Sequence, residues 1–131
     1  MIRRVSDEEF NAVTALPSDV RYEHLVKQVA DWSMIWSLKS PDGWVVGGDD
    51  SGRELHPVWP HERYAAAAAI DAWKGTAPAG IEIHEWLEVW TAGMVEAGRL
   101  VAVFPTDRGD YTAIDPRAFA DDIATELARI E

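Results

Sequence analysis

The sequence contains no cysteine, which removes several kinds of chemistry at once. Disulfide bonds, thiolate nucleophiles and cysteine-ligated metal sites are excluded, and the lack of thiols suits a reducing compartment. No stretch approaches the ~20 apolar residues that span a membrane. The amino terminus carries Arg3 and Arg4 but continues into Asp7, Glu8 and Glu9, which is not the pattern of a secretory signal. We therefore expect a cytoplasmic protein.

Basic residues are also scarce. The chain has 12 lysines and arginines against 23 aspartates and glutamates, a formal net charge of -11 at pH 7. This balance disfavours partners that are polyanions, so we predict neither a nucleic-acid partner nor an anionic membrane partner. Solubility is the simplest meaning of the charge. The alternative is an acidic surface that speeds the encounter with a basic protein partner. The sequence leaves the oligomeric state open.

Length and composition indicate one folded unit. The chain has 131 residues, of which 47% are hydrophobic and 27% charged, far from the composition of disordered chains. The segment 75–80 contains glycine, threonine and proline and is the most linker-like in the sequence. It is too short to separate two domains. We therefore predict a single α+β domain over residues 1–131.

Two helices are predicted near the amino terminus. Ser6 and Glu9 have the spacing of a capping box, and Pro17 should end the helix that follows. Ser18 is placed to cap a second helix. The apolar side chains of this second helix recur at helical spacing, which leaves Arg21 on the face predicted to contact water.

The rest of the chain alternates strands and helices. Alternating apolar and β-branched residues, bounded by turn residues, predict strands over 34–39, 44–48 and 54–59 as a three-stranded meander, and further strands over 100–104 and 111–114. Pro57 cannot donate to a ladder and belongs at an edge, a bulge or a strand end. The apolar run 100–104 is predicted as the buried central strand. Together these segments predict about five strands in a mostly antiparallel sheet covered by helices.

Three helices are predicted to cover this sheet. Pro60 suits a helical first turn, and the five consecutive alanines 65–69 favour a helix over 61–73 that packs closely. A brief strand over 81–83 could precede a second helix, which should begin near Ile83 and end before Gly98. The apolar stripe of this helix contains Ile83, Leu87, Trp90 and Met94. The last should be capped by Asp115.

Several short motifs carry a resemblance to a known family. They are Arg21-Tyr22-Glu23, Gly43-Trp44, Asp49-Asp50 with Gly52, Pro57-Val58-Trp59-Pro60-His61, Trp86-Leu87, Gly93-Met94 and Val101-Ala102-Val103-Phe104-Pro105. With these motifs, the run from about residue 21 to 127 resembles the bacterial proteins grouped as domain of unknown function family 2750. This resemblance implies no activity, substrate or catalytic residue. Ala97 departs from the acidic residue expected there in such proteins.

No catalytic or metal-binding pattern stands out. His56 and His61, with Asp49, Asp50 and Glu54, could supply nitrogen and oxygen ligands, but their spacing matches no recognised site, so we predict no metal and no cofactor. Nucleophile motifs are missing around the serines, among them Ser33, Ser37 and Ser51. Glu85 and Glu88 could share one helix face as an acid and a base do, but we favour a solvated acidic face, because paired acids need an apolar surrounding that splits their pKa values.

Two hypotheses about function follow. The first is a non-enzymatic acidic module that binds another protein, as an immunity or accessory factor; it rests on the negative charge and on seven tryptophans in a small chain. The second is a small-ligand site, with or without catalysis, in a cleft near Pro57–Pro60. Polar and aromatic side chains should converge there. The predicted ligand-binding residues are Trp44, His56, Trp59, His61 and Tyr64.

Overall fold

The computed structural model describes residues 3–49 and 51–130. The fold begins with two helices, α1 (Asp7–Thr14) and α2 (Ser18–Trp32). The Ser6 hydroxyl accepts the N–H of Glu9 at 3.1 Å, as the capping pattern predicts. The predicted cap by Ser18 is wrong: Pro17 holds the N-cap position in an extended conformation, and α2 already includes Ser18.

The first sheet contains β1 (Met34–Ser40), β2 (Gly43–Trp44) and β5 (Ala77–Glu82) in the order β2-β1-β5, with antiparallel pairs. Most of the segment that looked like a linker is therefore strand. β5 pairs with β1 from Met34↔Glu82 to Lys39↔Ala77. It lies at the edge of this sheet, where Pro78 is tolerated because an edge strand needs fewer N–H donors. The proline and glycine content hid most of this strand, and only its end falls within the brief strand that the sequence suggests over 81–83.

The second sheet contains β3 (Gly47–Gly48), β4 (Glu54–Val58), β6 (Leu100–Val103) and β7 (Thr112–Ile114), in the order β3-β4-β6-β7. β4 and β6 run parallel, and the other pairs are antiparallel. β6 has strands on both sides and three buried residues, which confirms the prediction of a buried central strand.

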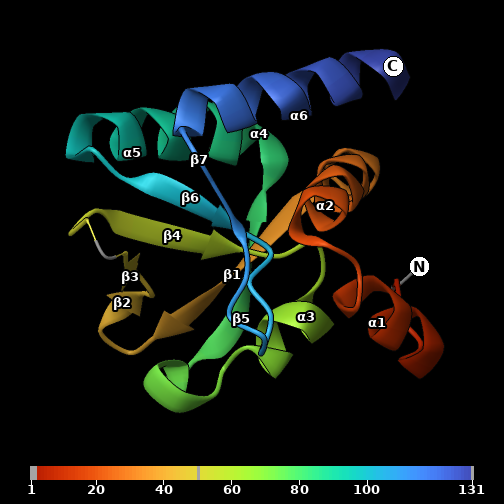
Figure 1. Cartoon of the computed structure of the whole chain (residues 1–131). Coiled ribbons are helices and arrows are strands. Elements are labelled where there is room, and N and C mark those ends of the chain that lie inside the picture. Colours follow the sequence, from red (N-terminus) through yellow and green to blue (C-terminus); the bar gives the residue numbers. More distant parts are fainter. Residues whose placement is uncertain (1–2, 50, 131) are drawn as a thin grey trace.

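The α+β class and the mostly antiparallel pairing are confirmed, but the strands form two sheets instead of one. The predicted meander is wrong because the run 44–48 divides into β2 and β3, which pair in different sheets. Between β1 and the end of β4 there is one isolated bridge, Trp36↔Trp59, in which each backbone N–H donates to the other's carbonyl. Figure 1 shows β4 and β6 side by side.

The alanine-rich helix is shorter than predicted. α3 spans Glu62–Ala67, its N-cap is His61, and Pro60 precedes the helix. The predicted helix over 61–73 is wrong at its end, because the chain turns at Ile70 and Asp71 and continues as a 3₁₀ turn, η1 (Asp71–Trp73). This turn brings the Trp73 ring edge-on to Trp59, with ring centroids 5.9 Å apart. Tertiary packing here overrides the helix propensity of alanine.

The remaining helices lie over one side of the second sheet (Figure 1). A continuous helix contains α4 (Ile83–Glu85), a π-helical turn η2 (Trp86–Trp90) and α5 (Thr91–Ala97), and it ends at Gly98 with a left-handed φ of 71° as predicted. In α6 (Pro116–Ile130), Asp115 Oδ1 accepts the N–H of Arg117 at 2.9 Å, which confirms the predicted cap. None of the described helices is both long and apolar enough to cross a membrane.

Candidate functional site

The structure distributes the five predicted ligand-binding residues over separate surroundings. Trp59 is fully buried, and its indole Nε1 donates to the carbonyl of Pro105 at 2.9 Å. His61 caps α3: its Nδ1 accepts the N–H of Arg63 at 3.1 Å, and its Nε2 lies 3.1 Å from the carbonyl oxygen of Arg3. Trp59 and His61 therefore have structural partners for their polar atoms.

Tyr64 belongs to an aromatic group with Phe10 and Phe104. Its ring stacks on Phe10 at 5.5 Å and is tilted against Phe104 at 5.0 Å. The hydroxyl is buried and finds no hydrogen-bond partner among the described residues. Burial, with a contribution from the charge of Glu9, raises the pKa of Tyr64 to about 12. The hydroxyl is therefore neutral at ordinary pH.

Trp44 and His56 meet on another part of the molecule, together with two tryptophans of the π-helical region. We call Trp44, His56, Trp86 and Trp90 the tryptophan cluster. Trp86 and Trp90 stack with centroids 5.6 Å apart, the Trp44 ring is perpendicular to Trp90 with centroids 4.8 Å apart, and the His56 ring lies 5.1 Å from Trp90. Such perpendicular and stacked arrangements are favourable for aromatic rings.

The π-helical turn aligns the two tryptophans of α4–α5. Within this turn the backbone N–H of Thr91 bonds to the carbonyl of Trp86, and the Thr91 hydroxyl donates to the same oxygen at 3.0 Å. Turns of this kind occur often at functional sites. The sequence predicted the helix and its apolar stripe but gave no sign of the wider turn.

His56 is a buried, neutral imidazole. It is 1% exposed, and its Nε2 lies 3.3 Å from the hydroxyl oxygen of Ser37. Burial, and secondarily the charge of Arg99, lowers the pKa of His56 to about 4. Ser37 is fully buried and donates its hydroxyl proton to the carbonyl of Pro57 at 2.7 Å. This Ser–His pair therefore lacks the exposed oxygen that a nucleophile needs.

The acidic turn after β3 is closed by its own hydrogen bonds. Asp49 Oδ1 accepts from the backbone N–H and hydroxyl of Ser51 and from the N–H of Arg53, and these bonds lower the pKa of Asp49. Asp50, which the metal hypothesis also named, lies outside the described residues. Across residues 3–49 and 51–130, no group of three or more histidine, aspartate or glutamate side chains could hold a metal ion.

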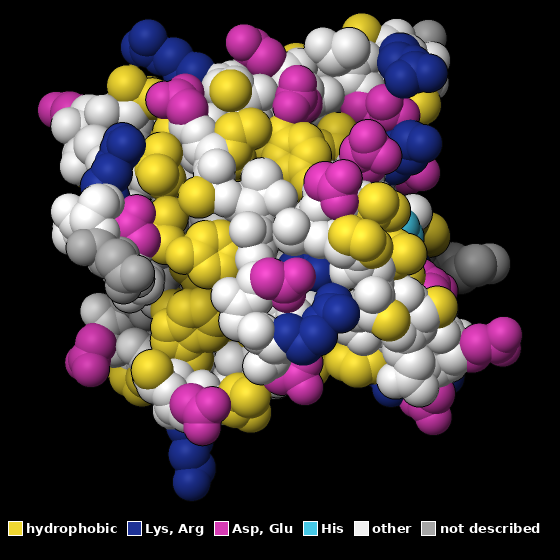
Figure 2. Space-filling view, in the orientation of Figure 1, with side chains coloured by type: hydrophobic (Ala, Val, Ile, Leu, Met, Phe, Trp, Pro, Cys, Tyr) yellow, Lys and Arg dark blue, Asp and Glu magenta, His cyan; other side chains and the backbone are white. Residues whose placement is uncertain are grey.

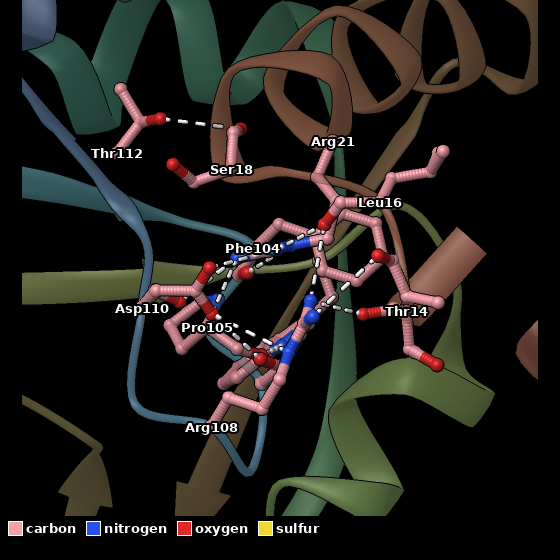
Figure 3. Close-up of polar contacts among 12 residues, drawn as sticks. Thr14, Leu16, Ser18, Arg21, Phe104, Pro105, Arg108, Asp110 and Thr112 are labelled. Carbon is pink, nitrogen blue, oxygen red and sulfur yellow. Dashed lines mark hydrogen bonds and ion pairs between the residues drawn. The ribbon is translucent and has the colours of Figure 1, made fainter. Parts of the chain in front are cut away.

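Arg21 is the polar residue that sequence reasoning misplaced. The prediction that it faces water is wrong, because it is fully buried. Its guanidinium donates to the carbonyls of Leu16, Phe104 and Asp110 at 2.7, 3.2 and 2.9 Å, and to Asp110 Oδ2 at 3.3 Å (Figure 3). Bonding to Arg21 is the main cause of a lowered pKa at Asp110.

A second arginine fastens the same loop, residues 104–111, which we call the β6–β7 loop. Arg108 reaches back to the end of α1, where it donates to the carbonyl of Thr14 at 2.6 Å and to that of Leu16 at 3.1 Å. Figure 3 shows both guanidinium groups pointing into the space between this loop and the α1–α2 connection. The two arginines fix the loop that lines several grooves.

Three shallow grooves border the β6–β7 loop. One of 360 Å³ lies between the loop, α1 and α3, a second of 290 Å³ lies along η1, and a third of 200 Å³ lies toward β3 and β4. Their walls are largely apolar, and Figure 2 shows hydrophobic side chains gathered on this face. Tyr64 lines the first groove. Of the five predicted ligand-binding residues, it is the one that lines any of these three grooves.

A larger groove of 580 Å³ lies between α2 and α6. Tyr22 and Val26 contribute apolar surface, and the Tyr22 hydroxyl donates to the carboxylate of Asp122. Burial and the Asp122 carboxylate raise the pKa of Tyr22. Acidic side chains prevail around the groove, and Figure 2 shows them gathered over α2 and α6. The charged lining residues are Asp19, Glu23, Asp122, Glu126, Lys27 and Arg129.

A pocket of 260 Å³ opens beside the tryptophan cluster, between β4, the π-helical turn and α5. His56 and Trp90 form part of its lining, together with Arg99, which directly precedes β6. Of the five predicted residues, His56 is therefore the one in this pocket, with Trp44 packed behind it. Sequence reasoning missed Arg99, which gave no signal because it lies outside any motif.

A comparison with protein families gives one match. The profile described as "Protein of unknown function (DUF2750)" matches residues 22–123, and the chain belongs to this family. The match covers most of the chain and confirms the resemblance carried by the short motifs. No curated protein matches the chain.

Proposed function

We propose that this member of DUF2750 is a non-enzymatic acidic module that binds another protein in the cytoplasm, as an immunity or accessory factor. The groove between α2 and α6 is the surface assigned to the partner. The observation that carries the proposal is the lining of this groove, where four carboxylates outnumber two cationic side chains around apolar surface.

The groove has the features that a basic, partly apolar segment would require. Tyr22 and Val26 offer apolar contact area along α2. Asp19 and Glu23 lie on the same helix one turn apart, so lysine or arginine side chains of a partner can meet both. The net charge of -11 adds a long-range attraction that speeds the encounter.

The chemistry of the groove favours binding over catalysis. Asp122 is exposed and accepts from Tyr22, and Glu126 accepts from Arg129 at 3.3 Å, so each of these carboxylates already has a hydrogen-bond partner at the surface. A pair of catalytic acids needs surroundings that push their pKa values apart. A binding surface needs only that the carboxylates stay charged.

The test is quantitative affinity capture from an extract of the source cells with the tagged full chain. The groove variant Asp19→Lys/Glu23→Lys is compared with the control Glu88→Lys/Glu96→Lys, which makes the same charge change at two exposed positions on the α4–α5 helix. We expect a stoichiometric partner that wild type and control retain, that the groove variant loses, and that salt releases. Equal recovery by all three proteins, or no salt-sensitive partner, would contradict the proposal.

A further inference from the structure

The pocket beside the tryptophan cluster combines a buried acceptor, a cation and apolar walls. It has a volume of 260 Å³ and is lined by His56, Val89, Trp90, Gly93, Met94 and Arg99. That volume corresponds to roughly nine water molecules at ~30 Å³ each. The pocket is therefore of a size for a small organic molecule.

The hydrogen-bond role of His56 follows from its neighbours. The single hydroxyl proton of Ser37 is used in the 2.7 Å bond to the Pro57 carbonyl, so Ser37 Oγ can only accept from His56 Nε2. The proton of the neutral ring therefore resides on Nε2, and Nδ1 carries a lone pair. Nδ1 has no hydrogen-bond partner in the described chain, and it is not among the polar atoms that are fully enclosed. It remains available as an acceptor where His56 lines the pocket.

Arg99 supplies the positive charge. Its side chain is 35% exposed, and its Nε lies 3.6 Å from Glu54 Oε1. This distance allows an ion pair but is too long for a hydrogen bond, and Nε is buried without a hydrogen-bond partner among the described residues. A guanidinium presents several donors in a planar fork that matches a carboxylate. Arg99 lines the pocket, so its guanidinium can pair with the carboxylate of a ligand bound there.

The walls favour a flat apolar body. Trp90 contributes aromatic surface to the pocket, and its ring is held in place by stacking on Trp86 and by the perpendicular ring of Trp44. Val89 and Met94 add aliphatic and thioether surface. A side chain that is already held in place loses little conformational freedom when a ligand binds against it.

We propose that this pocket binds a small aromatic carboxylate that also carries a hydroxyl or N–H group. The carboxylate pairs with the guanidinium of Arg99, the ring packs on Trp90, and the hydroxyl or N–H donates to Nδ1 of His56. The site is separate from the α2–α6 groove, so the binding of this ligand does not depend on the proposed protein partner.

The first test uses three matched probes with the full chain at low ionic strength. The probes are 4-hydroxyphenylacetate, phenylacetate without the hydroxyl donor, and 4-hydroxyphenylethanol without the carboxylate. Binding is measured by calorimetry and by the change in tryptophan fluorescence. We expect the complete probe to bind most tightly, and each truncated probe to bind about tenfold more weakly, the effect of losing one well-made polar contact.

The second test uses variants of the pocket. An added Cβ at Gly93 meets no atom within 4 Å, so Gly93→Leu can fill the pocket without disturbing its polar groups. Its matched control is Ala92→Leu, at the neighbouring exposed position. Arg99→Met removes the cation, and Arg117→Met is the matched control at an exposed arginine on α6. We expect Gly93→Leu to abolish binding and Arg99→Met to weaken it about tenfold, while both controls bind as wild type does.

Thermal unfolding of every variant accompanies these measurements, so that a loss of binding is assigned only to a folded protein. Failure of all three probes to bind at millimolar concentration would overturn the proposal. Binding that persists in Gly93→Leu, or that is equally strong for all three probes, would also overturn it. Neither result bears on the proposal of a protein partner, because that proposal is tested with variants of other residues.

Discussion

Arg21 and Asp110 lie 89 residues apart in the sequence and are joined through both the side chain and the backbone of the aspartate. The arginine is fully buried, whereas the Asp110 side chain is 44% exposed. One end of this contact therefore lies in the core and the other at the surface. The contact ties the start of α2 to the loop that lines the three apolar grooves.

Replacing Arg21 should destabilise the fold strongly. In Arg21→Met the carbonyls of Leu16 and Phe104 lose a charged donor, and we expect the free energy of unfolding to fall by about 3 kcal/mol. Arg21→Lys should recover only part of this loss, because an ammonium cannot reproduce the planar fork. Urea unfolding measures both. Arg117→Met, at an exposed arginine, serves as the control and should change stability little. A loss in Arg21→Met no larger than in that control would show that the buried contact is not stabilising.

The buried His56 should make stability depend on pH. Its pKa is lowered to about 4 in the folded protein from an ordinary value of 6.5, so the unfolded chain binds the proton first as the pH falls. The stability contributed by neutral His56 is present above pH 6.5 and is lost as the pH falls toward 4. The loss amounts to about 3 kcal/mol.

The measurement compares wild type with His56→Gln by urea unfolding at several pH values between these limits. The variant should lose less stability across the window, because the titrating group is gone while every other group remains. Parallel curves for the two proteins would refute the assignment of a depressed pKa to His56.

Two tyrosine substitutions should have opposite effects. The Tyr64 hydroxyl is buried without a described partner, so Tyr64→Phe removes an uncompensated polar group and should leave stability unchanged or raise it by up to about 1 kcal/mol. Tyr22→Phe loses the bond to Asp122 and should lower stability by about 1 kcal/mol. Thermal and urea unfolding compare the pair. A clear destabilisation by Tyr64→Phe would indicate that its hydroxyl has a partner.

The carboxyl-terminal cap of α5 should require glycine. Gly98 has a φ of 71°, and its N–H bonds back to the carbonyl of Val95. An added Cβ meets nothing within 4 Å, so the cost of Gly98→Ala is conformational and should be about 1 kcal/mol. Gly93→Ala is a useful comparison because Gly93 lies inside the helix, where alanine is favoured. The two variants should therefore shift the thermal midpoint in opposite directions.

Local signals in the sequence were sufficient for the ends of several elements. Ser6, Asp115 and Gly98 act through backbone groups within a few residues, and all three do in the fold what their residue types predict. The apolar run of β6 was also recognisable, because a strand that is buried on both faces is apolar throughout. Such features depend on neighbours in the sequence.

Features that depend on distant partners were not accessible in this way. The pattern around Arg21 is that of an exposed helix position, and only the carbonyls of Phe104 and Asp110 explain its burial. Pro78 and Gly80 made β5 resemble a linker, although its pairing with β1 gives it a fixed place. Arg99 likewise meets His56 only through the parallel pairing of β4 and β6. The candidate pocket could not have been located without the fold.

The parallel pairing of β4 with β6 also has a consequence for the order of folding during synthesis. β4 cannot meet its main partner until the chain has been made through Val103, whereas β1 and β5 are complete earlier. The first sheet can therefore form on a nascent chain while β4 still has an unpaired edge. Contacts that close long loops slow folding, so completion of the second sheet is expected to be the slow step.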